Sequence, residues 1–197
     1  DAKNIVVGAN FTFGAKAAGD VNYLRSVSEK YGFTVTGVEL VEYEHGIVSS
    51  TRIRKHLLNG GVEIARELLT RPHQLIGPVI HGEARGREIG YPTANIEVAP
   101  NSTIPSDGVY AVRVTIGDAN QVYDGMMNIG VRPTIDGKKR VVEVNIFDFD
   151  ADIYGAQLKV ELYYYLRGEV KFEGLEGLKA QLLQDKNKAA ALLQGAV

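Results

Sequence analysis

The pattern of the chain changes at His73, and this change restricts the possible folds more than any other feature. After His73, short runs rich in β-branched and aromatic residues are separated by Gly, Pro and Asp. Short strands with frequent turn residues are typical of an antiparallel barrel or sandwich. The predicted strands cover residues 74–81, 94–98, 108–116, 121–129, 140–147 and 157–166. Six strands are enough for a small closed barrel.

Helical spacing follows the last of these strands. Leu175, Leu178, Leu182 and residues 189–193 recur with the spacing of one helix face. We therefore expect a C-terminal helix that packs on the outside of the barrel or across its mouth.

The order of elements before His73 is different. Residues 4–8 form a predicted buried strand, residues 20–31 an amphipathic helix, and residues 33–42 a second strand. This order is typical of α/β folds. Ser49, Ser50 and Thr51 can cap a helix that runs to Leu58, and residues 62–69 form a further short helix. We place a domain boundary after residue 72.

Composition excludes several classes of protein. The chain has 197 residues, 45% of them hydrophobic and 23% charged, as in globular proteins with one substantial core or two small ones. A net charge of −2 gives no overall attraction to nucleic acid or to an anionic membrane. The absence of cysteine is compatible with a cytoplasmic setting. The start at Asp1, without an initiator methionine, suggests a piece of a longer protein.

Residues 77–95, GPVIHGEARGREIGYPTAN, contain four glycines and two arginines ahead of a Pro-Thr-Ala-Asn turn. Glycines let backbone N–H groups approach an anion, and Arg85 and Arg87 add positive charge. Thr93 and Asn95 offer neutral oxygen ligands of the kind that Mg²⁺ accepts when nucleotide phosphates complete its shell. A hairpin with turn glycines and a strand entrance explains the same residues without a ligand.

The segment as a whole resembles the nucleotide loop and the P-T-A-N metal motif of riboflavin kinases, which use ATP to phosphorylate riboflavin to FMN. The resemblance implies that Thr93 and Asn95 bind Mg²⁺ and that the loop binds ATP. The loop residues that it implicates are Gly77, Gly82, Arg85, Gly86, Arg87 and Gly90. The chain lacks a Walker-type G-x-x-x-x-G-K-[ST] sequence, so a kinase activity requires a different phosphate cradle.

Glu143 lies among apolar residues in the predicted strand 140–147. Desolvation makes a carboxylate a stronger base, and a base beside a primary alcohol can take its proton during phosphoryl transfer. The structural alternative is a position on the solvent face of an alternating strand. The resemblance implies the catalytic role, because riboflavin kinases place the base for the ribityl 5′-hydroxyl on this strand, ahead of a Tyr-Gly pair like Tyr154-Gly155.

Two further stretches extend the resemblance. Residues 128–134, NIGVRPT, match the N-I-G-x-R-P-T signature of the family, and the sequence predicts a strand end that turns sharply. Residues 165–172, YLRGEVKF, resemble its L-R-x-E-x-K-F stretch, although Gly168 and Val170 stand where charged residues are common. The resemblance implies that Asn128 and Arg132 help to close the site over the ligands, and that Arg167 and Phe172 lie near the flavin.

The N-terminal segment carries a second resemblance. Residues 7–14, VGANFTFG, and 48–54, VSSTRIR, are similar to the rear half of the FMN adenylyltransferase module of bacterial bifunctional riboflavin kinase/FAD synthetases. Nucleotide-binding roles are implied for Asn10, Ser50, Thr51 and Arg54, although a capping box explains residues 49–52 without a ligand. The module's H-x-G-H motif does not occur, so we expect no adenylyl transfer by this chain.

The predicted fold is α+β. It consists of a Rossmann-like α/β fragment in residues 1–72, then a six-stranded antiparallel Greek-key barrel with a C-terminal helix in residues 73–197. The resemblance implies ATP and riboflavin as substrates, Mg²⁺ as cofactor, FMN and ADP as products, and no nucleic-acid or membrane partner. Self-association through the incomplete N-terminal segment is an additional hypothesis. A non-catalytic flavin- or nucleotide-binding barrel and an inert structural barrel remain as alternatives.

Overall fold

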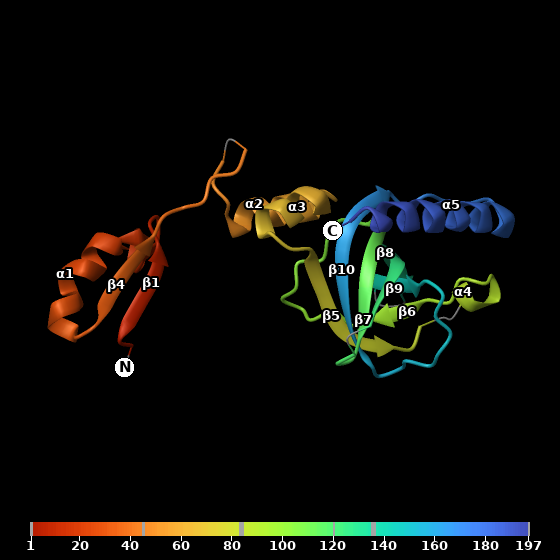
Figure 1. Ribbon diagram of the computed structural model, residues 1–197, viewed down its shortest axis with the longest axis horizontal. Coiled ribbons are helices and arrows are strands. Elements are labelled where there is room, and N and C mark those ends of the chain that lie inside the picture. Colours follow the sequence, from red (N-terminus) through yellow and green to blue (C-terminus); the bar gives the residue numbers. More distant parts are fainter. Residues whose placement is uncertain (1, 45, 83–84, 120, 135–136, 197) are drawn as a thin grey trace. The chain divides into compact units, whose positions relative to one another are not determined.

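The computed structural model describes residues 2–44, 46–82, 85–119, 121–134 and 137–196. The chain divides into two compact units, Asp1–Ser49 and Ser50–Val197. Figure 1 labels their helices and strands.

The N-terminal unit is a small α/β arrangement. Its strands β1 (Asn4–Gly8) and β4 (Thr34–Val38) pair in parallel, with α1 (Val21–Tyr31) between them in the chain. Asp20 caps α1 by accepting a hydrogen bond from the Tyr23 N–H at 2.8 Å, and Gly32 ends it with a φ of 68°. A short pair, β2 (Thr12–Phe13) with β3 (Gly19–Asp20), flanks the 3₁₀ helix Ala15–Ala17. The predicted strand–helix–strand order is confirmed.

The second unit contains a closed barrel with the strand order β10-β5-β6-β9-β8-β7, antiparallel at every pair (Figure 1). The strands are β5 (His73–Ile80), β6 (Ala94–Ile96), β7 (Gly108–Ile116), β8 (Val122–Thr134), β9 (Gly137–Ile146) and β10 (Gln157–Arg167). The predicted six-stranded antiparallel barrel is therefore confirmed.

Alternate residues of the strands face the barrel interior. Tyr110, Met127 and Val144 are fully buried there, in a cluster to which the other strands contribute Leu75, Ile96 and Leu158. The residues between them, such as Asn128 and Glu143, face outward because side chains alternate along a strand. This alternation decides which polar groups can meet on the outer surface.

The helices α2 (Ser50–Leu58) and α3 (Val62–Leu69) belong to the barrel unit. Leu57, Val62 and Ala65 are buried in the same cluster as the barrel core, and the Glu63 carboxylate accepts a hydrogen bond from the Tyr165 N–H at 3.0 Å. The compact unit consequently begins at Ser50, ahead of the domain boundary that the sequence predicts after residue 72. As a boundary between two families of domain, residue 72 stays a prediction.

The C-terminal helix α5 (Leu175–Gln194) packs on the outside of the barrel (Figure 1). Ala189 and Leu193 are fully buried against outward-facing barrel residues, among them Val109, Ala111 and Met126. Of the two predicted placements, outside the barrel or across its mouth, the first is correct.

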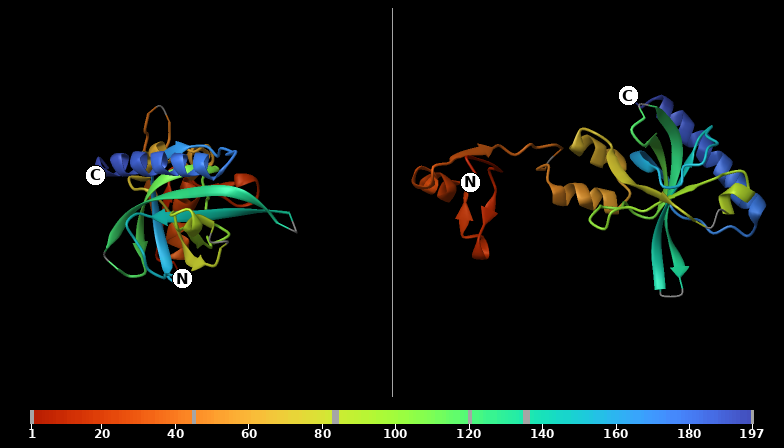
Figure 2. Two further views of the ribbon diagram at one scale, coloured as in Figure 1. Left: turned by 90° about the vertical axis from the view of Figure 1, so that its right-hand side faces the viewer. Right: turned by 90° about the horizontal axis from the view of Figure 1, so that it is seen from below.

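One sequence prediction about the barrel is wrong. Residues 128–134 do not turn sharply, because β8 continues to Thr134 and pairs with β9 as far as Gly137. The right-hand view of Figure 2 shows the ends of these two strands projecting from the barrel as an arm. The cross-strand hydrogen bonds of this arm keep Arg132 in an extended strand, although Gly130 and Pro133 are typical turn residues.

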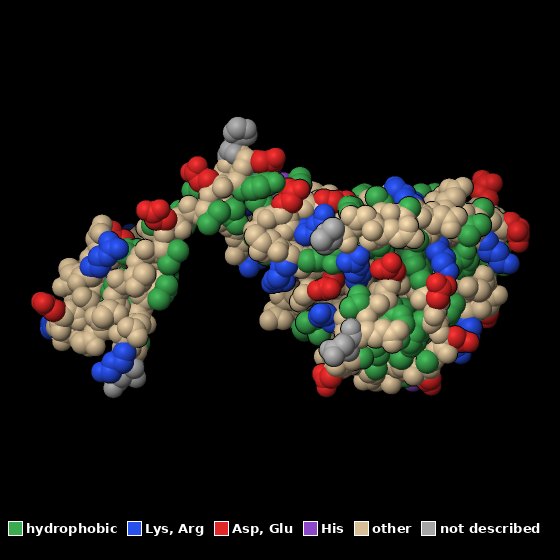
Figure 3. Space-filling model, in the orientation of Figure 1, with side chains coloured by type: hydrophobic (Ala, Val, Ile, Leu, Met, Phe, Trp, Pro, Cys, Tyr) green, Lys and Arg blue, Asp and Glu red, His purple; other side chains and the backbone are tan. Residues whose placement is uncertain are grey.

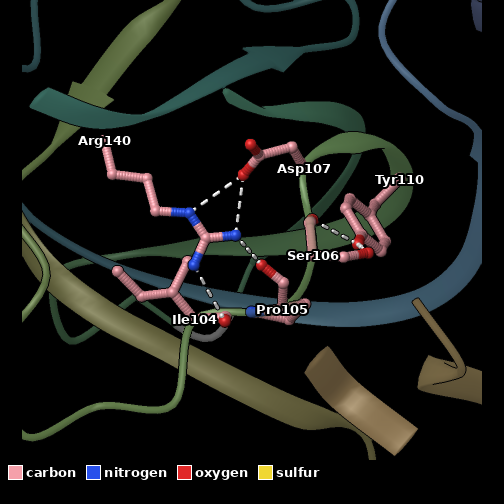
Figure 4. A network of polar contacts seen from close by, with 6 residues as sticks. All are labelled: Ile104, Pro105, Ser106, Asp107, Tyr110 and Arg140. Carbon is pink, nitrogen blue, oxygen red and sulfur yellow. Dashed lines mark hydrogen bonds and ion pairs between the residues drawn. The ribbon is translucent and has the colours of Figure 1, made fainter. Parts of the chain in front are cut away.

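The loop before β7 is fixed by a polar network (Figure 4). Arg140 on β9 donates to the Asp107 carboxylate at 2.8 Å and to the carbonyls of Ile104 and Pro105. The buried Tyr110 hydroxyl donates to the Ser106 carbonyl at 2.6 Å. Burial raises the pKa of Tyr110 to about 12, because the ionised phenolate would lose its hydration.

The face seen in Figure 3 carries both signs of charge. In Figure 3, acidic and basic side chains are interspersed over the face shown, with hydrophobic side chains between them. Within the part of the chain that the structure describes, no helix is both long enough and apolar enough to cross a membrane.

Candidate active site

Three polar residues lie side by side on adjacent strands of the barrel. Asn95 on β6 is the cross-strand partner of Glu143 on β9, and Glu143 is in turn the partner of Asn128 on β8. Directly opposed residues of an antiparallel sheet project to the same face with Cβ atoms about 4.5–5.5 Å apart. Their neighbours Val144 and Met127 are buried inside the barrel, so this row lies on the outer face. The strand register thus brings together three residues from separate sequence motifs.

Glu143 contacts an arginine. Arg132 Nη2 lies 2.8 Å from Glu143 Oε1 and 2.9 Å from Oε2, and 13% of the Glu143 side chain is exposed. The sequence suggests isolation among apolar residues, but the β8–β9 pairing brings Arg132 to it. Since one nitrogen serves both oxygens, the carboxylate keeps lone pairs that can accept further hydrogen bonds.

A cavity of about 290 Å³ lies beside Glu143, between the outer face of the barrel and α5. Its apolar wall includes Val109, Met126, Leu178 and Leu182. Its polar wall is formed by Thr93, Asn128, Glu143, Asn145, Arg167 and Glu169. Val170 and Phe172 line it from the segment between β10 and α5. Five of the predicted site residues, Thr93, Asn128, Glu143, Arg167 and Phe172, therefore border one cavity.

Arg167 has a structural task at this cavity. Its Nε and Nη2 atoms donate to the Asp185 carboxylate at 2.7–3.0 Å, and Gln181 donates to the same carboxylate at 2.9 Å. Asp185 lies on α5 and is 3% exposed. The pair therefore ties β10 to α5 and holds the helix over the cavity. The guanidinium also lies 5.9 Å from the centre of the Phe172 ring, a cation–π contact.

The glycine-containing segment approaches the P-T-A-N residues closely. A Cβ atom at Gly82 would overlap the Asn95 carboxamide, and one at Gly86 would overlap the Tyr91 carbonyl and lie 3.5 Å from Thr93 Oγ1. Gly86 belongs to α4 (Arg85–Glu88), a single helical turn. The glycines at 82 and 86 thus allow the segment to lie against Asn95 and Thr93. The side chain of Arg85 is outside the described part of the structure.

The other two glycines of the segment have local explanations. Gly77 lies in β5, where a Cβ atom would overlap the Glu97 carbonyl beside β6, so glycine is needed for close strand packing. Gly90 has a φ of 83° and ends the turn that follows α4. A role for either in phosphate binding remains a prediction.

A second, smaller cavity of about 70 Å³ lies at one end of the barrel interior. Its lining includes Arg87, Pro92 and Thr93 on one side and residues 149–154 on the other. Thr93 borders both cavities. Thr93 precedes β6 and Asn95 lies within it, so the P-T-A-N residues also form a strand entrance.

Sequence reasoning missed two polar residues of the larger cavity. Asn145 is 7% exposed, and its Nδ2 donates to the Pro92 carbonyl at 2.7 Å. Glu169 places Oε1 against the Cα of Gly130, where a Cβ atom would overlap it. The signal for Asn145 was present, because a polar residue two positions from Glu143 shares its face of the strand. No sequence signal identifies Glu169 as a neighbour of Gly130.

The remaining predicted residues lie elsewhere. Asn10 follows β1 in the N-terminal unit, and Ser50, Thr51 and Arg54 lie on α2 in the barrel unit. Across the residues that are described, no group of three or more His, Cys, Asp or Glu side chains could hold a metal ion. A metal near Thr93 would therefore need neutral oxygens and oxygens from a ligand.

Fold and site together define a small antiparallel barrel with a ligand cavity between its outer face and a covering helix. The riboflavin kinase family matches residues 69–193, and the FAD synthetase family matches residues 1–52. The chain belongs to the riboflavin kinase family.

Related proteins agree with this assignment. The bifunctional riboflavin kinase/FMN adenylyltransferase of Haemophilus influenzae is 38% identical over 189 residues, covering 96% of this chain and 61% of that protein. The protein of the same name from Bacillus subtilis is 39% identical over 193 residues, covering 96% of this chain and 60% of that protein. The chain thus spans about three fifths of the length of these relatives.

A solved structure has the same fold. The crystal structure of a Streptococcus pneumoniae protein described as a macrolide-efflux protein superposes with a TM-score of 0.83 at 40% sequence identity, covering 95% of this chain and 60% of that one.

Proposed function

We propose that this chain is a riboflavin kinase, which transfers the γ-phosphate of ATP to the ribityl 5′-hydroxyl of riboflavin and releases FMN and ADP. The observation that carries the proposal is the register of Asn95, Glu143 and Asn128 beside the larger cavity, with Thr93 bordering both cavities. Membership of the riboflavin kinase family and the names of the relatives support it.

The larger cavity suits the acceptor. Val109, Met126 and Leu182 offer an apolar wall to a flat aromatic ring, and Phe172 can stack on or beside it. Glu143 and Asn128 lie on the polar wall, where hydroxyl groups of a ribityl chain find hydrogen-bond partners. A volume of about 290 Å³ is near the lower end of the range for small-molecule pockets, about 300 Å³.

The barrel mouth suits the phosphate donor. Arg87 and Thr93 line it, and Gly86 lets the α4 turn approach Thr93. A cavity of about 70 Å³ is too small for a nucleotide. We therefore expect one wall of the mouth, α4 or residues 149–154, to move outward when ATP binds.

Thr93 and Asn95 are the proposed Mg²⁺ ligands. Thr93, just before β6, borders the larger cavity together with Glu143, and Asn95, two residues further on, is the cross-strand partner of Glu143. Neutral oxygens suit Mg²⁺ when phosphate oxygens supply the negative charge, and this fits the lack of an acidic cluster among the described residues. When bound, the ion offsets charge on the transferred phosphoryl group.

Glu143 is the proposed base. Its carboxylate orients the 5′-hydroxyl and accepts its proton as the new oxygen–phosphorus bond forms and the bond to the ADP oxygen breaks. Arg132 keeps the carboxylate in place while leaving acceptor positions for the substrate. Most of the rate enhancement then comes from positioning and electrostatics.

The wider context is also part of the proposal. The relatives carry FMN adenylyltransferase in their name, and we assign that second activity to a full-length parent only, since this chain has no H-x-G-H motif. The partners are small molecules, the setting is the cytoplasm, and self-association would use the paired β1 and β4 of the N-terminal unit.

The direct test is to incubate the purified chain with riboflavin and MgATP and to measure FMN by chromatography. Reactions without ATP, and reactions with EDTA, are the controls. We expect FMN that depends on both ATP and Mg²⁺.

The two alternatives give different results. Riboflavin or nucleotide binding without FMN formation would favour a non-catalytic binding barrel. The absence of any thermal shift with riboflavin and MgATP together would favour an inert structural barrel.

A further inference from the structure

Two polar side chains are buried among the residues described here, Asp185 and Asn145. Asp185 is explained by its contacts with Arg167 and Gln181. Asn145 has a different partner, since its Nδ2 donates to the carbonyl of Pro92 at 2.7 Å across a gap of 53 residues in sequence. Buried polar side chains are usually hydrogen-bonded, and the bond to Pro92 satisfies the buried amide of Asn145.

The bonded carbonyl belongs to the Pro92–Thr93 peptide group. Because a peptide group is planar, fixing the Pro92 oxygen also fixes the nitrogen of Thr93 and limits where its hydroxyl can lie. The preceding residue is held as well, because the Tyr91 N–H donates to the Gly86 carbonyl at 2.8 Å. The turn is therefore fixed on one side by α4 and on the other by β9.

Asn145 and Glu143 are two residues apart on β9 and project from the same face. One strand thus holds the carboxylate beside the larger cavity and also holds the backbone that carries Thr93, which borders both cavities. The separation between Glu143 and Thr93 is set through this single rigid element.

We infer that Asn145 is a positioning residue, which places the Thr93 hydroxyl for the divalent cation that accompanies the nucleotide. The inference deepens the proposed kinase function and depends on it. Residues that orient a metal ligand without touching the metal typically change metal affinity or activity by about 10- to 100-fold when they are replaced. Loss of the Asn145 donor should therefore weaken the cation-dependent part of nucleotide binding.

The test compares Asn145→Asp, which keeps the shape but lacks the N–H donor, with Asn145→Leu, which lacks both polar groups. Asn59→Asp is the matched control, because Asn59 Nδ2 also donates to a backbone carbonyl, that of Lys55, at 2.8 Å and borders neither cavity. Calorimetry would measure ADP binding with and without Mg²⁺, and a second titration would measure riboflavin binding. Thermal unfolding would identify variants that do not fold.

We expect both Asn145 variants to lose about 10-fold or more of the Mg²⁺-dependent gain in ADP affinity. Riboflavin affinity should change much less, and the Asn59 variant should match the wild type. In FMN formation, the Mg²⁺ concentration for half-maximal rate should rise in the Asn145 variants and not in the control.

A folded Asn145 variant with wild-type Mg²⁺ dependence would overturn the positioning role and leave the kinase proposal intact. Equal losses of ADP affinity with and without Mg²⁺ would also overturn it, because a purely structural role predicts that pattern. If Asn145→Leu does not fold, Asn145→Asp decides the matter. A wild-type chain that makes no FMN would instead overturn the kinase proposal and this inference with it.

Discussion

Asp185 and Glu143, two of the carboxylates in the barrel unit that are held by arginines, have different surroundings. Asp185 is 3% exposed and accepts two nitrogens of Arg167 as well as the Gln181 amide. Glu143 meets a single nitrogen of Arg132, whose side chain is 33% exposed, and it borders a cavity. The first pair has its hydrogen bonds satisfied within the fold, whereas the second keeps acceptor positions facing open space. An arginine–carboxylate pair thus stabilises the fold at Asp185, whereas at Glu143 the carboxylate is available to a ligand.

Replacing Glu143, the carboxylate that borders the cavity, should have the strongest effect, and this effect is on kcat. Glu143→Gln should lower kcat for FMN formation by about 10²- to 10⁴-fold, because the amide cannot accept the hydroxyl proton. Nucleotide binding should stay nearly unchanged. Steady-state kinetics with calorimetry would measure both. Glu161→Gln on β10 is the control, since Glu161 also accepts a side-chain hydrogen bond but lines neither cavity. An unchanged kcat in the Glu143 variant would exclude the base role.

Replacing the buried carboxylate, Asp185, should lower stability. Asp185→Ala leaves the Arg167 guanidinium, whose side chain is 20% exposed, without its carboxylate partner, which should cost about 3 kcal/mol of the free energy of unfolding. Urea denaturation would measure it. The exposed pair of Lys179 with Glu176, whose side chain is 94% exposed, is the control, and Glu176→Ala should change stability by less than about 1 kcal/mol. Similar small losses in both variants would remove the distinction between the two carboxylates.

The side chain of Tyr110 carries a hydroxyl and is buried, as Asp185 is. Its pKa is raised to about 12, so the folded state binds its proton more tightly than the unfolded state does. The resulting stability is fully present below about pH 10, the ordinary value, and is lost as the pH rises toward about 12; the difference is about 2–3 kcal/mol. Unfolding free energies of the wild type and Tyr110→Phe across this range would reveal it. Parallel pH profiles would show that Tyr110 makes no such contribution.

The smallest of these effects concerns the neutral metal ligands. Thr93→Val combined with Asn95→Leu should weaken Mg²⁺-dependent nucleotide binding by about 10-fold or more, because both proposed oxygen ligands are lost. Calorimetry of MgADP binding is the measurement. Thr115→Val on β7 lines neither cavity and should bind normally. Normal MgADP affinity in the double variant would contradict the metal assignment.

Much of the fold could be predicted because its signals are local. The β-branched and aromatic run at residues 108–116 predicted β7 with the bounds that the structure has, and the helix predicted over residues 62–69 is α3. The predicted helix 20–31 matches α1 to within one residue, and the structure shows that Asp20 caps its start and the left-handed Gly32 ends it. The glycine and proline in residues 128–134 predicted a turn that the structure does not have, because pairing with β9 outweighs their local preference.

The residues of the candidate site could be predicted from the sequence, but the contacts between them could not. Sequence motifs singled out Thr93, Asn95, Asn128 and Glu143, but their common face depends on the register of three strands that only barrel closure defines. The same limit applies to Arg132 on Glu143, since that contact requires the long β8–β9 pairing. Contacts between residues distant in sequence carry no local pattern.

The proposed kinase function requires Glu143 and Thr93 to act on the same transferred phosphoryl group from adjoining cavities. A crystal structure of the chain with FMN and MgADP tests it most directly. We expect the FMN phosphate between the Glu143 carboxylate and a Mg²⁺ ion bound to Thr93 and Asn95, with the flavin ring beneath α5. A flavin bound elsewhere, or a Mg²⁺ ion without contact to Thr93, would contradict it.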